Sequence, residues 1–306
     1  MKAAHEILRN MRLASFALAG LFFAVDATAT VSVSVSGNVA TAFVQLPDAN
    51  TPTYTATVTI TFDAVNNLTP DSLNLTAVLI DPNNPPPLPA QVSIDPDFPV
   101  VIEVEPTVAL FRNGFEPGQV GNGNLDFLNT YEFDIDTPNL TCGSATSTYR
   151  LYKAPHGSNT FADVTDDLLN GSVRARGRGG AFSRFVLVKD DRPQSILGLI
   201  PPIALQKLTD LVFRLASSSS VTGTLLTTLT DLLGNITADL TTLDINAALF
   251  DLDTFIADIT AASNNNEIAN EWNADRSLVN DAGELLSLAQ TLRFSLTLLN
   301  GATLCN

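Results

Sequence analysis

The spacing of apolar residues changes once along this chain, at a proline-containing segment covering residues 193–202. Before that segment apolar and polar residues alternate, and after it apolar residues recur every three or four positions. Alternation places apolar side chains on one face of a β-strand, whereas steps of three and four place them along one side of a helix. The pattern therefore predicts a two-domain α+β protein, with a β domain followed by a helical domain.

The β pattern is clearest at residues 31–35 and 54–62, where every second residue is apolar. Pro- and Asn-rich breaks separate further short candidate strands, which favours an antiparallel, immunoglobulin-like β-sandwich over residues 30–192. Within it, one helical turn is expected at residues 162–169. A hairpin is expected at residues 171–192, because its glycine-rich centre permits a tight turn.

The helical pattern is strongest from Leu225 to Ile259, with a break near Asp244 where a new helix would begin. One more helix is expected before this stretch and one after it, the last stopping near Gly301. Four helices joined by short links favour an up-down four-helix bundle over residues 203–306, with residues 193–202 as the linker.

One stretch of the helical half, between Leu215 and Thr230, has no charged residue and a polar face of Ser and Thr. Solvated helix faces usually carry Lys and Glu, which are better helix formers than threonine. Two interpretations stay open. The face is either exposed surface that contacts nothing, or it rests on the sandwich or on a second chain.

The first 29 residues have the layout of an export signal. Basic residues within the first twelve positions precede an uncharged apolar run, Leu13 to Val25, and small residues follow at Ala27 and Ala29. The run is too short to span a bilayer as a helix. We expect cleavage before Thr30, a periplasmic or extracellular location, and no transmembrane segment in the mature chain.

Charge and cysteine content narrow the possible partners. The 306 residues include 32 Asp and Glu against 16 Lys and Arg, for a net charge of −16. Because such a surface repels polyanions, no nucleic-acid partner is expected. The two cysteines, Cys142 and Cys305, are predicted to form a disulfide, as is typical of an even pair in an exported protein; two unpaired thiols are the alternative.

Catalytic chemistry finds little support in the sequence. His156 is the only histidine after the export signal and lies in a turn-like segment. The chain has no G-x-S-x-G motif, no nucleotide-binding glycine motif and too few ligands for zinc, so we expect no cofactor and no enzymatic activity. Paired acids such as Glu103 and Glu105 nevertheless keep open a secreted hydrolase with a carboxylate pair in the cleft between the domains.

Two short acidic segments are candidate calcium sites. Asp95 and Asp97 flank a proline, and Asp134 and Asp136 flank an isoleucine. Calcium prefers carboxylate oxygens, but neither segment matches the EF-hand loop. The alternative for such alternating acids is the solvated face of a half-buried strand.

The basic residues concentrate at Arg174, Arg176 and Arg178, which are spaced two apart and therefore project from one face of a strand. They are a candidate binding site for a phosphate, sulfate or carboxylate group. The alternative is that they pair with acids of the protein itself, for example those of the helical bundle.

One segment, LFRNGFEPG at residues 110–118, has the character of a tight turn, because Asn113-Gly114 favours a hairpin. It resembles a short F-x-[D/N]-G-F-E element that recurs in exported, mostly uncharacterised proteins of Gram-negative bacteria. The resemblance implies membership of an uncharacterised family whose proteins are located in the bacterial cell envelope, and it assigns no residue roles.

These patterns together favour an exported, non-enzymatic structural or interaction protein. Its partner would be an unknown protein, or a second copy bound through the helical domain. The secreted hydrolase is the second hypothesis, and a binder of small apolar ligands within the bundle is the third.

Overall fold

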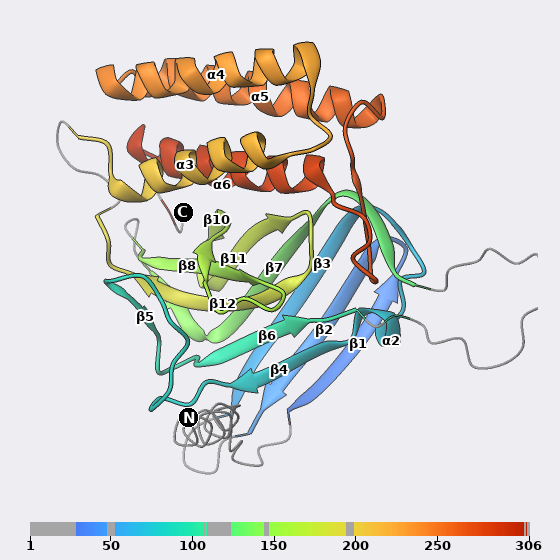
Figure 1. Ribbon diagram of the computed structural model, residues 1–306. Helices are drawn as coiled ribbons and strands as arrows, with labels where there is room; N and C mark the ends of the chain where they lie inside the picture. Colours follow the sequence, from blue (N-terminus) through green and yellow to red (C-terminus); the bar gives the residue numbers. More distant parts are fainter. Residues whose placement is uncertain are drawn as a thin grey trace, which may run out of the picture.

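The computed structural model describes residues 29–47, 53–106, 108, 124–143, 147–193, 199–302 and 304. Two antiparallel β-sheets pack face to face, and four long helices stack at one end of the sandwich (Figure 1). The predicted export signal, apart from its last residue, and the LFRNGFEPG segment lie outside the described residues, so both stay predictions.

The larger sheet has the strand order β1-β2-β3-β7-β11-β10, with β13 paired beside β7. Alternate residues such as Val44 on β2 and Ile60 on β3 are buried, which confirms the predicted β pattern. The strands of this sheet are β1 (Thr30–Ser36), β2 (Val39–Leu46), β3 (Tyr54–Asn66), β7 (Asp126–Cys142), β10 (Thr165–Leu169), β11 (Gly171–Gly179) and β13 (Glu271–Asn273).

The smaller sheet has the order β4-β6-β12-β8-β9, with β5 beside β12. Phe133 of the larger sheet stacks on Phe185 of the smaller sheet with ring centroids 3.9 Å apart, so a shared aromatic core joins the two. The elements here are a short helix α2 (Pro70–Leu73) and strands β4 (Leu75–Leu79), β5 (Val92–Ile94), β6 (Val100–Val104), β8 (Tyr149–Pro155), β9 (Ala162–Asp163) and β12 (Ser183–Asp190).

Two local predictions in the β half are wrong. Residues 162–169 form strands β9 and β10 instead of a helical turn, because an extended chain lets Val164 and Leu168 reach the sandwich core. Strands β11 and β12 do not form a hairpin: β11 pairs with β7 and β10, whereas β12 pairs with β8, β6 and β5. The chain between them crosses from one sheet to the other. A Cβ atom at Gly180 would collide with the backbone of Gly283, so this glycine serves close packing between elements.

The four long helices are α3 (Pro202–Ser217), α4 (Gly223–Thr242), α5 (Ile245–Asn264) and α6 (Asp281–Leu299). The break predicted near Asp244 is confirmed, since its carboxylate caps α5 by accepting a hydrogen bond from the Ala247 N–H group at 3.0 Å. No helix in the described part of the chain is both long and apolar enough to cross a membrane.

The helices form two layers (Figure 1). Helices α3 and α6 make the inner layer, and α4 and α5 make the outer layer, which is farther from both sheets. A shared apolar cluster that includes Leu211, Leu229, Leu252 and Leu292 holds the layers together. A self-contained up-down bundle is not confirmed, because α6 packs on the larger sheet and β13, between α5 and α6, joins that sheet.

The C-terminal end of the chain returns to the sandwich. Leu304 is buried within the sandwich core, and so is Cys142 at the end of β7. Cys305 lies outside the described residues, so the Cys142–Cys305 disulfide stays a prediction.

Candidate functional site

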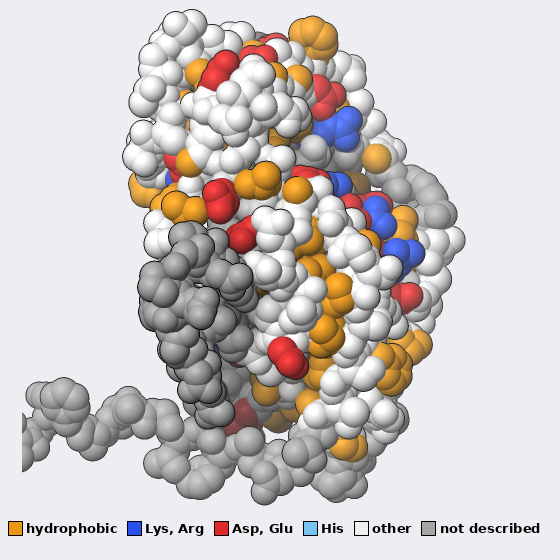
Figure 2. All heavy atoms as spheres, turned by 90° about the vertical axis from the view of Figure 1, so that its right-hand side faces the viewer, with side chains coloured by type: hydrophobic (Ala, Val, Ile, Leu, Met, Phe, Trp, Pro, Cys, Tyr) orange, Lys and Arg blue, Asp and Glu red, His pale blue; other side chains and the backbone are white. Residues whose placement is uncertain are grey.

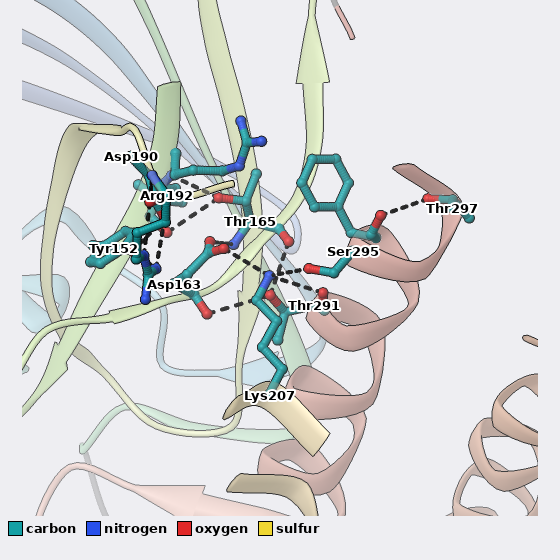
Figure 3. A network of polar contacts seen from close by, with 12 residues as sticks. Tyr152, Asp163, Thr165, Asp190, Arg192, Lys207, Thr291, Ser295 and Thr297 are labelled. Atoms are coloured by element: carbon teal, nitrogen blue, oxygen red, sulfur yellow. Dashed lines mark hydrogen bonds and ion pairs between the residues drawn. The ribbon is translucent and has the colours of Figure 1, made fainter. Parts of the chain in front are cut away.

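A buried ionic network fixes the inner helices on the sandwich (Figure 3). Lys207 of α3 is only 4% exposed, and its Nζ lies 2.7 Å from Oδ2 of Asp163 on β9. The same ammonium donates to the carbonyl of Thr291 at 3.1 Å and to the hydroxyl of Ser295 at 2.9 Å, both on α6. Burial lowers the pKa of Lys207, and Asp163 only partly offsets this effect. One side chain therefore ties α3, α6 and the smaller sheet together.

A second buried pair extends this network. Asp190 accepts hydrogen bonds from the Tyr152 hydroxyl at 2.7 Å and from the Arg192 guanidinium at 2.6 Å. Burial raises the pKa of Asp190, but these hydrogen bonds outweigh it and the pKa is lowered overall. Nearby, two nitrogens of buried Arg150 have no hydrogen-bond partner, and its guanidinium lies 5.5 Å from the centre of the Phe294 ring on α6. The network thus uses its charges internally, as an anchor.

An arginine ladder, defined as Arg174, Arg176 and Arg178, runs along the outer face of β11. The structure places acids of the protein itself against all three, and these acids come from the flanking strands β7 and β10 instead of the helices. Figure 2 shows charged side chains gathered just below the helices, whereas apolar and uncharged polar ones cover most of the face beneath. The shortest pairs are Arg174–Asp134 at 2.8 Å, Arg176–Glu132 at 3.0 Å, Arg178–Glu132 at 2.9 Å and Arg178–Asp166 at 3.0 Å. An external anion would have to displace these carboxylates.

One acid that pairs with this ladder, Asp166, has an unusual pKa. Burial raises the pKa of Asp166 to about 6, and the neighbouring Arg178 opposes the rise. Its Oδ1 atom is buried without a hydrogen-bond partner. A carboxyl with a raised pKa, close to a second carboxyl group such as that of Glu132, is one feature that a carboxylate-pair hydrolase requires.

The candidate calcium ligands are engaged by other groups. Asp95 pairs with Lys189 at 2.7 Å and also accepts a hydrogen bond from the backbone N–H of Asp97. Asp134 pairs with Arg174 of the arginine ladder at 2.8 Å, and Asp136 accepts a hydrogen bond from the Ser172 hydroxyl at 2.6 Å. Within the described ranges, no group of three or more His, Cys, Asp or Glu residues is placed to hold a metal ion.

His156 lies near the surface, where its Nδ1 is 2.8 Å from Oε2 of Glu105. The same carboxylate pairs with Arg276, from the segment that follows β13, at 2.5 Å. This exposed cluster therefore links the loop after β8 to the segment between α5 and α6.

A small polar pocket of about 170 Å³ lies in the cleft between the larger sheet and helices α5 and α6. It is lined by Asp63, Thr130 and Arg178 from the sandwich and by Thr260 and Gln290, among others, from the helices. Asp63 is the one carboxylate among the described lining residues, and it already accepts hydrogen bonds from the Thr130 N–H and hydroxyl groups at 3.0 and 2.8 Å. The pocket therefore lacks the pair of acids that the hydrolase hypothesis places there.

A larger groove of about 560 Å³ lies between α3 and α4. We call it the α3–α4 groove. The described residues that line it include no charged side chain. They are Val212, Leu215 and Ala216 of α3 and Leu226, Thr230, Leu233, Gly234 and Thr237 of α4.

The uncharged stretch noted in the sequence contributes to both walls of this groove, through Leu215 and Ala216 of α3 and through Leu226 and Thr230 of α4. Because α4 belongs to the outer layer, the sandwich does not cover it, and that part of the prediction is wrong (Figure 1). The threonine hydroxyls form hydrogen bonds within their own helix: Thr230 donates to the Leu226 carbonyl and Thr237 donates to the Leu233 carbonyl, each at 2.7 Å. A partner could therefore cover this face without leaving these hydroxyls unpaired.

Two features of these sites were missed by sequence reasoning. Lys207 lies on the apolar side of its helix between Ala204 and Leu211, and a lysine at such a position is a signal for a buried ion pair. Gly234 interrupts the middle of a helical pattern, where glycine is costly and usually has a packing or functional reason.

Comparison with known proteins gives one match. A protein-family model described as a family of unknown function (DUF6689) matches residues 14–300. No curated protein and no solved structure matches the chain.

Proposed function

The chain belongs to DUF6689, a family of unknown function, and on the geometry above we propose that it is an exported, non-enzymatic interaction protein that binds a protein partner through the α3–α4 groove. The observation that carries this proposal is the groove itself, an uncharged, mainly apolar depression of about 560 Å³. Helix-in-groove recognition uses such a surface, because the apolar face of a partner helix can be buried in it.

The surface beside the groove adds to this argument. Phe213 is 74% exposed on α3, the adjacent groove-lining residue Val212 is also exposed, and Leu205 is exposed about two turns earlier on the same helix. Single exposed apolar residues are common on proteins, but several beside an apolar groove indicate an interaction site. Covering them with a partner would remove this apolar area from water.

The rest of the molecule is a scaffold that holds the groove in place. The ionic network around Lys207 and Asp163 anchors α3, which is one wall of the groove, to α6 and to the sandwich. A binding surface on fixed elements loses less conformational entropy when a partner binds.

Export is supported by the N-terminal sequence pattern and by the acidic composition. N-terminal sequencing of the secreted protein is expected to begin at Thr30.

The proposal can be tested with a neutral apolar dye, Nile red, added to the mature chain at low protein concentration. We expect blue-shifted emission from dye in the groove, and a strong reduction in Thr230→Glu, because the new charge lies in the groove wall. Thr228→Glu is the matched control, since Thr228 is exposed on the same helix but does not line the groove. Equal dye binding by both variants, or none by the wild type, would refute the groove as an apolar binding surface.

The hydrolase remains a second candidate because of one observation, the raised pKa of Asp166 beside Glu132. A panel of aryl glycosides and esters would be incubated with the wild type and with Asp166→Asn. Turnover that disappears in Asp166→Asn, with the fold retained, would favour the hydrolase over the interaction protein.

A further inference from the structure

We propose that the occupant of the α3–α4 groove is a second copy of this chain, so that two protomers bind groove to groove about a two-fold axis. The inference rests on the proposed function, since it names the partner of the same surface.

The first argument is that the surface is self-complementary. Phe213 follows the groove-lining residue Val212, and one residue of α-helix turns the side chain by about 100°. The exposed Phe213 side chain therefore forms a ridge next to the groove wall. A two-fold interface requires one patch to carry both the projecting and the receiving surface, and this patch carries both.

The second argument is a glycine in the groove. Gly234 lies in the middle of α4, and a Cβ atom placed on it would meet no atom within 4 Å. Glycine in the middle of a helix costs about 1 kcal/mol relative to alanine. No close contact within the described chain requires a glycine at this position. A glycine leaves the helix backbone bare, which allows a second helix to approach closely. Contact with another chain gives this residue a role.

The third argument comes from charge. The chain carries a net charge of −16, so two copies repel each other over most of their surfaces. The repulsion between two such molecules is weakest where the facing surfaces are uncharged. Residues 216–230 contain no charge, and neither do the described groove-lining residues. A cationic partner would instead be recognised by acidic groups, which the groove lacks.

The experiment is sedimentation velocity on the mature full-length chain over a wide concentration range. We expect a concentration-dependent species of twice the monomer mass. Gly234→Leu, which fills the close-approach position, and Thr230→Glu, which places a charge in the interface, should each weaken dimerisation about tenfold or more. Thr228→Glu makes the same charge change outside the groove and should leave the dimer intact. Circular dichroism and melting curves verify that each variant is folded, and Gly234→Leu should fold readily because the site is open.

Two outcomes would overturn the inference. One is a wild-type dimer that persists in folded Gly234→Leu and Thr230→Glu, because the interface would then lie elsewhere. The other is a wild type that stays monomeric at every concentration. In that case the Nile red assay separates the two proposals. A monomer whose groove binds dye in the wild type but not in Thr230→Glu has a different protein as partner, whereas a monomer that binds no dye refutes the proposed function as well.

Discussion

Replacing Lys207 with methionine tests whether the buried ionic network anchors the helices. The substitution keeps a long apolar side chain but removes the ammonium that pairs with Asp163 at 2.7 Å. Hydrogen bonds to the Thr291 carbonyl and the Ser295 hydroxyl are lost as well. Asp163 would be left buried between the sandwich and the helices without its nearest cation.

The expected cost follows from this burial. Breaking a buried ion pair by removing one partner typically costs about 3–5 kcal/mol, because the remaining charge is uncompensated. We expect about 3 kcal/mol, at the low end, since Asp163 also interacts with the positive charge of Arg150. Removing both charges together in Lys207→Met with Asp163→Asn should cost less than the sum of the two single changes.

The measurement is urea unfolding of the wild type, the two single variants and the double variant, followed by circular dichroism. The surface pair Arg293–Asp253 provides the control, because its side chains are 44% and 52% exposed. Arg293→Met should change the free energy of unfolding by less than about 1 kcal/mol.

Two results would refute the reasoning about the anchor. One is a cost for Lys207→Met no larger than that for Arg293→Met. The other is strict additivity in the double variant, because groups that interact directly are expected to show a coupling energy.

Four further predictions concern separate parts of the molecule. Gly234→Ala should raise the unfolding free energy of the dilute protein by about 1 kcal/mol, measured in urea, because alanine is the better helix former; an unchanged or lower value would contradict this. The pKa of Asp166 is raised from 3.8 to about 6, so its contribution to stability is greatest at low pH and falls by about 3 kcal/mol as pH rises from about 4 to 6. Asp166→Asn should flatten that part of the stability curve, and identical wild-type and variant curves would refute the shift. Gly283→Ala should lower the melting temperature strongly, because a Cβ atom there would collide with the backbone of the sandwich. If Cys142 and Cys305 pair, neither should react with a thiol reagent until a reductant is added, and reduction should cost about 5 kcal/mol on the loop-entropy estimate, whereas immediate labelling of both would exclude the bridge.

The parts of the fold that the sequence predicted well are those governed by local periodicity. Val44 and Ile60 lie at every-second-residue positions and are buried in strands, and the change of period after residue 202 marks the start of the helices. The helix cap at Asp244 could also be predicted from the sequence, because its hydrogen bond joins residues within one helical turn. Local pattern and local hydrogen bonding are sufficient in these places.

The parts that were mispredicted depend on contacts between distant segments. The glycines near residue 180 suit a tight hairpin turn, but here Gly180 lies against Gly283, more than 100 residues later in the chain. The same limitation applies to the candidate site. The acids that pair with Arg176 lie on other strands, and the α3–α4 groove depends on how two separate helices are placed in the fold. Such pairings have no signature in a single sequence.

Strand β13 has a consequence for the order in which the protein can be assembled. Its Trp272 stacks on Phe127 with ring centroids 5.2 Å apart, and Leu304 enters the same core near the end of the chain. The first half of the polypeptide therefore cannot complete its own interior. Until the last residues have been synthesised, part of the hydrophobic centre of the sandwich stays open to water, so we expect the sandwich to reach its full stability only after the C-terminal segment is in place.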